Sequence, residues 1–273
     1  MAAPRSDELK IIMNKKPNLR SNPRSETHCA DCPIRGQALF RGVPAAELEW
    51  IEEFRDAQYL LKARELLYRQ GETAYSLYTL FDGWLILFRI LDGGERQILR
   101  FVLPGDFIGF QVNGSGAAAG YTHGAQALVD STLCAFPRQR LREMMERQPR
   151  LAIGLAEMGM HDMTLCQHHL IGTGRKNARE SIAFLLLELF HRVQRQLPHG
   201  YEEQGHSVIF PLTQEDIGDA LGLTSVHVNR VLKEMEREGY IACRKRRLTI
   251  RNAEALMVIG QFDPGMVTPC PLI

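Results

Sequence analysis

The C-terminal fold is decided by the stretch Leu212-Thr213-Gln214-Glu215-Asp216-Ile217-Gly218-Asp219-Ala220-Leu221-Gly222-Leu223-Thr224-Ser225-Val226-His227-Val228-Asn229-Arg230. Thr213 and Thr224 are N-cap residue types, and Asp216 falls in the first turn of a helix, where a carboxylate meets free backbone amides. Gly222 suits a tight turn between two steeply crossed helices. The stretch therefore predicts a helix-turn-helix.

The second helix of this motif is predicted to have two different faces. Its apolar residues recur at helical spacing and form a buried stripe of Val228, Val231, Leu232 and Met235. The opposite face is short, polar and cationic, as a helix in a DNA major groove must be. An ordinary helical hairpin beside a solvated charge run is the alternative. The residues expected to contact DNA from this helix are Thr224, Ser225, Val226, His227, Asn229, Arg230 and Lys233.

A basic hairpin follows the second helix. Residues 240–243 and 248–250 are strand formers, and four cations lie at the turn between them, where they would meet phosphate oxygens. Caps, turn, core stripe and hairpin agree with one another, which favours a winged helix-turn-helix. The expected phosphate contacts are Arg244, Lys245, Arg246 and Arg247.

Composition places bounds on the rest of the molecule. The 273 residues make one large or two ordinary domains, and 45% hydrophobic with 24% charged residues is typical of globular proteins. The formal net charge is only +1, so DNA binding must rest on local charge such as that of residues 244–251. No membrane partner is expected, and without a signal-peptide core we expect a cytoplasmic protein. Its six cysteines are then thiols or metal ligands rather than a disulfide framework.

The pattern along the chain predicts an α+β protein. Residues 1–27 are expected to be a disordered tail, and 28–137 a cysteine-bearing segment followed by an antiparallel β-roll, because short strand-forming runs alternate with glycine turns. Residues 138–171 are expected to form a long dimerisation helix, 175–255 the winged domain, and 256–273 a tail, disordered from Phe262. We also expect a short helix over 44–54, a hinge at 172–174 and a helix over 178–196.

The long helix carries a seam-like pattern. The positions alternate by four and three residues, as in a coiled coil: Leu151, Leu155, Met158, Asp162, Leu165 and His169. In a parallel pair, two Asp162 carboxylates would approach across the two-fold axis and repel. Asp162 is therefore a candidate dimer switch. The alternative is that Asp162 faces solvent and the dimer is permanent.

Four segments carry a family resemblance. They are 103–109 (LPGDFIG), 125–128 (AQAL), 176–180 (KNARE) and the helix-turn-helix. Together with the order of roll, seam helix and winged domain, they make residues 28–255 resemble the Crp/Fnr family of bacterial transcription regulators. The resemblance implies a cupin-like roll of the cyclic-nucleotide-binding-domain type. It also implies a homodimer bound to a pseudo-palindromic site in double-stranded DNA, and RNA polymerase as a partner.

Within that family, the segment 28–32 (HCADC) and Cys134 are most similar to the Fnr branch. That branch implies an oxygen-labile [4Fe-4S] cluster that controls dimerisation, with Cys29, Cys32 and Cys134 as its metal ligands here. Ala38 stands where the branch has another cysteine, and each iron of a cubane needs a ligand. A fourth ligand would come from His28, Asp31 or a thiolate elsewhere. Another metal, a thiol–disulfide switch and purely structural cysteines are the alternatives.

No cyclic nucleotide is expected as a ligand. Residues 111–123, which match the phosphate-binding cassette of the cyclic-nucleotide branch, contain no arginine and no carboxylate. A phosphodiester needs a cation and amide donors there. The sequence thus favours a non-enzymatic DNA-binding regulator that responds to oxygen or redox state, or one whose signal is nitric oxide, a thiol switch or another effector. A cysteine-based redox or metal enzyme and a winged scaffold that contacts protein are the rivals, but no catalytic motif supports the enzyme.

Overall fold

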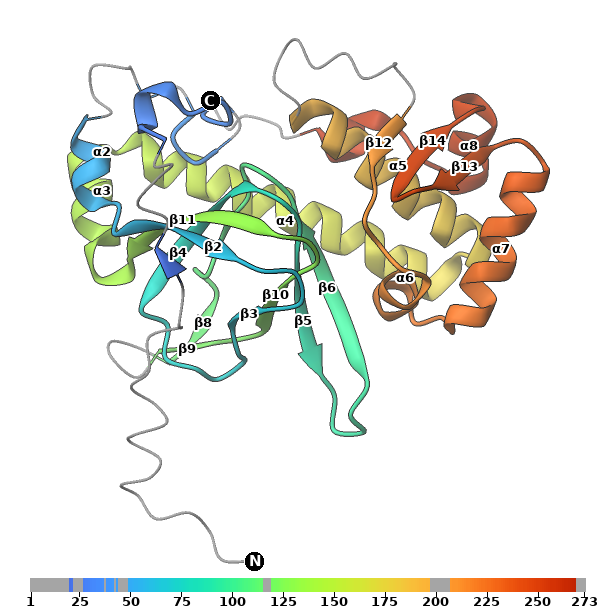
Figure 1. Ribbon diagram of the computed structural model, residues 1–273, viewed down its shortest axis with the longest axis horizontal. Helices are drawn as coiled ribbons and strands as arrows, with labels where there is room; N and C mark the ends of the chain where they lie inside the picture. Colours follow the sequence, from blue (N-terminus) through green and yellow to red (C-terminus); the bar gives the residue numbers. More distant parts are fainter. Residues whose placement is uncertain are drawn as a thin grey trace, which may run out of the picture. The chain divides into compact units, whose positions relative to one another are not determined.

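The computed structural model describes residues 20–21, 27–36, 38–41, 43, 49–114, 119–196 and 207–268 (Figure 1). The chain divides into two compact units. The first comprises residues 1–89 and 104–150, and the second comprises residues 90–103 and 151–273. Most of the predicted N-terminal tail lies outside the described residues. Disorder was expected throughout that tail, but residues 20 and 21 form a short strand.

The first unit is the predicted antiparallel roll. Its larger sheet has the strand order β1-β2-β11-β4-β7, formed by β1 (Arg20–Ser21), β2 (Ala57–Leu61), β11 (Ser131–Pro137), β4 (Ser76–Asp82) and β7 (Phe107–Ile108). In a second sheet, β10 (Gly124–Ala127) pairs with both β3 (Leu66–Tyr68) and β5 (Leu85–Ile90). A third pair joins β8 (Val112–Asn113) to β9 (Gly120–Tyr121). The core includes fully buried Leu67, Leu77, Leu80, Leu85, Ile86, Phe107 and Phe136.

Strand β11 shows how the roll presents one cysteine. Burial alternates along the strand, so Leu133 and Ala135 are buried whereas Cys134 is half-buried on the opposite face. The N-terminal cysteines lie in the short 3-10 helix η1 (Cys29–Asp31) and just after it. Of the helix predicted over residues 44–54, only α2 (Glu49–Phe54) falls within the described residues.

The predicted long helix over 138–171 is divided in the structure. A 3-10 turn, η4 (Arg138–Arg140), and helix α3 (Leu141–Arg147) precede α4 (Arg150–Arg175). The break falls at Gln148 because Pro149 disfavours helical backbone at the residue before it.

The predicted hinge at 172–174 is wrong. Helix α4 continues through these residues, where the Thr173 hydroxyl donates to the carbonyl of His169 at 3.2 Å. Gly172 is buried, and its carbonyl accepts from the Ser181 hydroxyl at 3.1 Å. The chain instead turns at Lys176–Asn177. There Asn177 and Glu180 exchange side-chain-to-amide hydrogen bonds, each 3.0 Å, at the start of the next helix.

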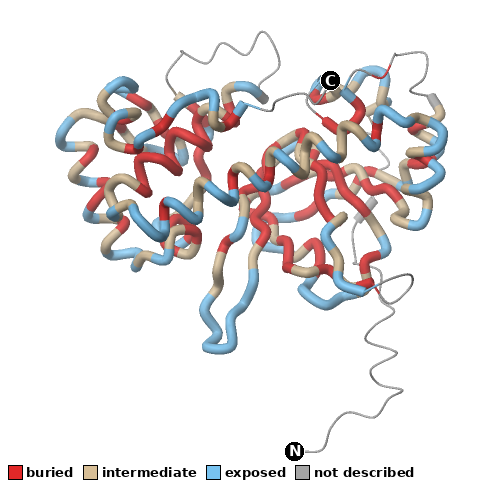
Figure 2. The backbone as a smooth tube through the Cα atoms, turned by 180° about the vertical axis from the view of Figure 1, so that it is seen from behind, coloured by how far each residue is buried: buried red, intermediate tan, exposed pale blue. Residues whose placement is uncertain are grey.

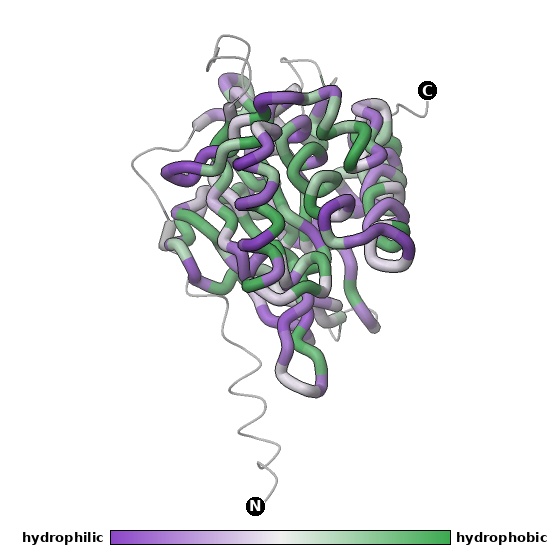
Figure 3. The backbone as a smooth tube through the Cα atoms, turned by 90° about the vertical axis from the view of Figure 1, so that its right-hand side faces the viewer, coloured by the Kyte–Doolittle hydropathy of each residue, from purple (hydrophilic) through white to green (hydrophobic). Residues whose placement is uncertain are grey.

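The second unit is built around α5 (Ala178–Gln196), the helix predicted over 178–196, which is buried along most of its length. Its other elements are β6 (Arg96–Val102), α6 (Gln214–Leu221), α7 (Ser225–Arg237), α8 (Ala253–Gly260) and a three-stranded sheet of order β12-β14-β13. The sheet strands are β12 (Ser207–Ile209), β14 (Arg247–Ile250) and β13 (Ile241–Arg244). The sequence did not predict β12. Figure 3 views this unit from the side of α7 and shows hydrophilic and hydrophobic stretches alternating along its helices.

The predicted disorder from Phe262 onward is also wrong as far as residue 268. Phe262 is buried, with its ring centroid 5.4 Å from that of Phe184 and 5.3 Å from that of His191. The 3-10 turn η5 (Pro264–Val267) follows, and Arg195 donates to the Val267 carbonyl at 2.6 Å. Single apolar residues among prolines carry no periodic signal, so the sequence pattern missed this docked segment. Residues 269–273 lie outside the described residues.

Candidate nucleic-acid interface and cysteine site

Helix α6 begins and ends as the sequence predicted. The Thr213 hydroxyl accepts a hydrogen bond from the Asp216 amide at 3.1 Å, and the Asp216 carboxylate accepts one from the Thr213 amide at 3.0 Å. This reciprocal capping box satisfies backbone donors that the helix leaves free. Gly222 ends the helix in the left-handed region, with φ of 69°. A Cβ at Gly218 would overlap the Leu223 carbonyl oxygen, so the backbone after the turn packs directly against α6 at this glycine.

Helix α7 separates a buried from an open face. The Thr224 hydroxyl caps the helix by accepting from the His227 amide at 3.3 Å. The predicted stripe of Val228, Val231, Leu232 and Met235 is buried. On the other side Val226 is 78% exposed. Of the predicted DNA contacts, the structure leaves Thr224, Ser225, Val226, Arg230 and Lys233 exposed and His227 and Asn229 half-buried.

The wing is a two-residue hairpin. Arg244 pairs with Arg247 across the ladder, and the turn between them is formed by Lys245 and Arg246, whose φ angles are 50° and 58°. Two successive positive φ angles match the type I′ turn that suits the strand twist, although side chains other than glycine, asparagine and aspartate adopt it at a cost.

The four wing cations are not equivalent. Arg244, Lys245 and Arg246 are exposed, so they are open to a phosphate. The Arg247 guanidinium instead donates to the Ser207 hydroxyl at 3.2 Å and so ties β14 to β12. Arg247 therefore has a structural role within the sheet, and its predicted contact with DNA stays a prediction.

The cysteines predicted to sense a signal lie close enough together to interact electrostatically. A charge on Cys134 raises the pKa of both Cys29 and Cys32. Burial is the larger cause at both sites, and the pKa of Cys29 rises to about 11. All three side chains are half-buried. Burial therefore favours the thiol over the thiolate at Cys29 and Cys32 at neutral pH.

Residues that the sequence analysis missed lie beside Cys134. The strand register places Gln58 of β2 and Thr79 of β4 on either side of it. The Gln58 amide donates to the Cys134 sulfur at 3.5 Å. The Thr79 hydroxyl is buried and has no hydrogen-bond partner among the described residues. Such buried polar groups require a partner, and only strand register, which the sequence did not give, could have found them.

A carboxylate organises the N-terminal cysteine segment from α2. Glu52 accepts from the Cys29 amide at 2.6 Å and from the His28 ring at 3.1 Å. The backbone around Cys29 is therefore fixed by a helix that lies more than twenty residues further along the chain. His28, a candidate fourth ligand, uses its Nδ1 in this contact.

Asp162 differs from its predicted role. Its carboxylate is buried and accepts from Arg100 of β6 at 2.7 Å. It therefore neither faces solvent nor carries an uncompensated charge. His169 likewise bonds Glu188 of α5 at 2.6 Å. Asp162 and His169, two of the six predicted seam residues, are thus bonded within the protein's own second unit, and Arg100 compensates the charge on which the predicted repulsion depended.

A different face of α4 is open. Exposed residues recur at spacings of four and three: Ala156, Met160, Met163, Gln167, Leu170 and Gly174. Met163 is 59% and Leu170 73% exposed, so large apolar side chains recur at a seven-residue interval on this face. Figure 2 shows exposed and buried positions alternating along this helix. A series with the predicted spacing is therefore exposed, but it is displaced by five residues from the expected one and lies on roughly the opposite side of the helix.

Known proteins share both halves of this architecture. Residues 180–259 match the Crp-like helix-turn-helix domain, and residues 60–148 match the cyclic nucleotide-binding domain. The transcriptional activatory protein AadR of Rhodopseudomonas palustris is 32% identical over 219 residues, which are 80% of this chain and 85% of that protein. The chain belongs to the Crp/Fnr family.

Two further members show the same relationship. The fumarate and nitrate reduction regulatory protein of Escherichia coli is 27% identical over 229 residues, covering 84% of this chain and 88% of that protein. The structure of FixK2 from Bradyrhizobium japonicum superposes with a TM-score of 0.65 at 27% identity, covering 74% of this chain and 96% of that one. As a Crp/Fnr regulator, the protein is a DNA-binding transcription regulator and not an enzyme. The predicted α+β fold and family are confirmed.

Family membership does not by itself supply the sensor. The match to a cyclic nucleotide-binding domain concerns the roll, and the expectation that no cyclic nucleotide binds stays a prediction. A [4Fe-4S] cluster needs four ligands; the resemblance implied only three, Cys29, Cys32 and Cys134, and Ala38 is buried where a fourth was sought. Within the described residues, no three His, Cys, Asp or Glu side chains are grouped to hold a metal. As placed, these residues do not fit the cluster. In the same described part of the chain, no helix is long and apolar enough to cross a membrane.

Proposed function

We propose that this Crp/Fnr regulator acts in the cytoplasm as a homodimer that binds a pseudo-palindromic DNA site and responds to oxygen or redox state through its cysteines. The observation that carries the DNA-binding part is the open face of α7. An apolar residue, Val226, stands 78% exposed there between Ser225 and the cation Arg230. This combination of an exposed apolar side chain with polar and cationic neighbours on one helix face suits contact with base edges in a DNA groove.

The chemistry of that face matches a major groove. Arg230 is the residue suited to paired hydrogen bonds with guanine O6 and N7. Val226 accepts no hydrogen bond but suits the methyl group of thymine. Two such helices in a two-fold dimer would contact half-sites about one helical turn apart. The exposed wing cations would add phosphate contacts that carry no sequence information.

Site selection from random duplex DNA tests the DNA-binding part. The unmodified protein should enrich a two-fold site, and Arg230→Ala should lose about 1–3 kcal/mol of binding free energy and relax one position in each half-site. Arg237→Ala is the matched control, because Arg237 is also an exposed cation of α7 but lies at its C-terminal end. An unchanged site preference in Arg230→Ala would contradict the assignment. No enrichment by the unmodified protein would contradict DNA binding itself.

The open face of α4 supports the dimer. Met160, Met163 and Leu170 form an apolar stripe with the seven-residue recurrence of a two-helix seam. A second copy of α4 would cover it, and Asp162 would influence the pairing only through its bond to Arg100. RNA polymerase is the further partner that a transcription regulator of this family implies.

The cysteines support the sensing part of the proposal because Cys29, Cys32 and Cys134 lie close enough to interact electrostatically. Two polar residues, Gln58 and Thr79, flank Cys134 on the neighbouring strands. Anaerobic purification followed by visible spectroscopy and assays of iron and acid-labile sulfide tests the form of the site. Iron and sulfide, with DNA binding lost in air, would support a cluster and require a rearrangement of the segment around Cys29. Iron-free protein whose DNA binding responds to a thiol oxidant, and is insensitive in Cys134→Ser, would support thiol chemistry. Iron-free protein whose DNA binding changes neither in air nor with a thiol oxidant would refute the sensing role.

A further inference from the structure

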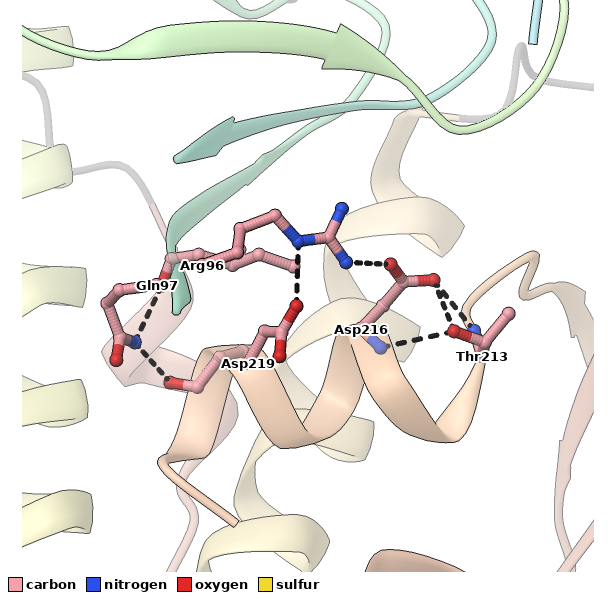
Figure 4. A network of polar contacts seen from close by, with 7 residues as sticks. Arg96, Gln97, Thr213, Asp216 and Asp219 are labelled. Carbon is pink, nitrogen blue, oxygen red and sulfur yellow. Dashed lines mark hydrogen bonds and ion pairs between the residues drawn. The ribbon is translucent and has the colours of Figure 1, made fainter. Parts of the chain in front are cut away.

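Strand β6 contacts the first helix of the helix-turn-helix through one arginine. Arg96 Nε donates to Asp219 at 2.7 Å, and its terminal nitrogen donates to Asp216 at 2.9 Å (Figure 4). The arginine side chain is 18% exposed and that of Asp216 only 1%, so the contact is largely shielded from solvent. Charge-assisted bonds from one planar guanidinium to two carboxylates are both strong and geometrically specific.

Asp216 has two tasks at this point. One carboxylate oxygen accepts from Arg96, and the other closes the capping box by accepting from the Thr213 amide and hydroxyl. The start of α6 is therefore fixed to the strand through the same side chain that begins the helix. Asp219, about one turn further along, accepts a second hydrogen bond from the same guanidinium.

The neighbouring residue of β6 holds the other end of α6. The Gln97 side-chain amide donates to the Ala220 carbonyl at 3.3 Å and to the Ile98 carbonyl of its own strand at 3.1 Å. Carbonyls in the last turn of a helix lack helical partners, so they are available to such a donor. Hydrogen bonds from the strand to both ends of this short helix restrain its rotation on the strand. Because Gly218 packs α6 closely against the turn, α7 follows the same orientation.

The strand also contacts the two long helices of the unit. Arg100 bonds Asp162 of α4, and the Phe101 carbonyl accepts from Arg192 of α5 at 3.1 Å. None of these contacts covers the open face of α7, where Val226 and Arg230 remain exposed. The contact of Arg96 therefore orients the DNA-binding motif rather than masking it.

We infer that Arg96 is a positioning residue for DNA recognition: it fixes the orientation of α6 and α7 relative to the α4 helix, and so sets the half-site spacing that a dimer accepts. This inference rests on the proposed function, because spacing has meaning only for two recognition helices in one assembly. A single half-site requires one α7 and places no demand on orientation. Two half-sites at a fixed spacing require both helices to meet the groove at once.

The test uses the full chain and three duplex probes built on the site that the unmodified protein selects from random DNA. One has the selected spacing, one has a spacing changed by one base pair, and one has a single half-site with the other scrambled. Arg96→Ala should bind the full site roughly 5- to 150-fold more weakly, the range of typical coupling between sites. Its affinity for the single half-site should stay within about twofold, and its preference between the two spacings should shrink or move. Arg89→Ala is the matched control for a lost charge, because Arg89 is an exposed cation on the neighbouring stretch of chain.

Two further variants separate positioning from folding. Lysine cannot form the planar fork, so Arg96→Lys should show an intermediate loss of spacing preference. The charge exchange Arg96→Glu with Asp219→Arg restores one opposite-charge contact and should recover part of the preference that Arg96→Glu alone loses. An equal loss on full site and half-site would mean that Arg96 merely stabilises the motif, and would overturn the inference. So would an unchanged spacing preference. Failure of the unmodified protein to bind any probe would instead refute the proposed function.

Discussion

Replacing Glu188 with glutamine should destabilise the second unit by an amount that depends on pH. Glu188 lies on α5 with its side chain 1% exposed, and accepts from His169 of α4 at 2.6 Å and from Arg192 at 3.2 Å. Arg192 is also buried and extends the network to β6 through the Phe101 carbonyl. Glutamine keeps the shape of the side chain but removes the charge that compensates two cations.

The magnitude follows from the carboxylate. Burial alone raises the pKa of Glu188, but the charges and hydrogen bonds of His169 and Arg192 outweigh it and lower the pKa from 4.5 to about 2. At 1.36 kcal/mol for each pH unit, that difference corresponds to about 3 kcal/mol of stability at neutral pH. Removing one partner of a buried ion pair costs roughly 3–5 kcal/mol in other proteins, which agrees.

The direction of the pH dependence also follows. Because the folded pKa of Glu188 is depressed, its contribution is complete above pH 4.5 and is lost as the pH falls towards about 2. Burial lowers the pKa of His169, but the charge and hydrogen bond of Glu188 raise it by more. The pKa of His169 therefore lies above 6.5 in the folded protein. The contribution of His169 is complete below pH 6.5 and is lost as the pH rises through the folded value. The network should stabilise most between about pH 4.5 and 6.5.

Urea denaturation followed by far-ultraviolet circular dichroism measures this effect. The difference in unfolding free energy between the unmodified protein and Glu188→Gln should be about 3 kcal/mol near pH 5.5 and smaller near pH 3.5 and pH 8.5. Glu146→Gln is the matched control, because Glu146 is exposed on α3. A loss below about 1 kcal/mol, the scale of an exposed pair, or a loss that is the same at all three values, would refute the reasoning.

Three shorter predictions concern the other surfaces. Thr224→Ala removes the cap of α7 and should lower the unfolding free energy by about 1 kcal/mol, whereas Thr224→Ser should be nearly neutral; thermal denaturation compares them. Lys245→Gly relieves a positive φ and should raise stability by roughly 1 kcal/mol while reducing the slope of log affinity against log salt by about 1. Unchanged salt dependence would mean that the wing tip does not meet phosphate. Met163→Glu should convert the dimer to monomer in light scattering, while Met163→Leu should not; a dimer in both would place the interface elsewhere than on the open face of α4.

The helix-turn-helix was predictable because its determinants are local. A cap and its partner lie three residues apart at both Thr213 and Thr224, and the left-handed turn at Gly222 needs only the absence of a side chain. The wing followed for the same reason, since a two-residue hairpin is determined by its own strands. Arg247 was the exception, because its partner Ser207 lies on a strand forty residues earlier, beyond the segments that the pattern covered.

The cysteine site shows the limit of that approach. Spacing in the sequence identified Cys29 and Cys32, and only a family resemblance added Cys134. Gln58 and Thr79 carry no motif, and they became neighbours of Cys134 through the register of three strands distant in sequence. Register depends on which residues the whole sheet buries, so a single strand does not predict it.

Helix α4 shows why a correct periodicity can still give the wrong surface. A helix with apolar or small residues around much of its circumference offers more than one series at spacings of four and three, and the sequence alone does not say which series its own chain covers. The polar residues of the series identify the face that the rest of the chain covers. Asp162 and His169 could not be buried in an apolar seam without hydrogen-bond partners. Their partners are Arg100 and Glu188, which turn that series inward and leave Met160, Met163 and Leu170 outward. A charged residue in a predicted seam therefore indicates first that this face of the helix packs against the protein's own chain. Here strand β6 supplies the opposite charges: Arg96 pairs with α6 and Arg100, four residues later, pairs with α4.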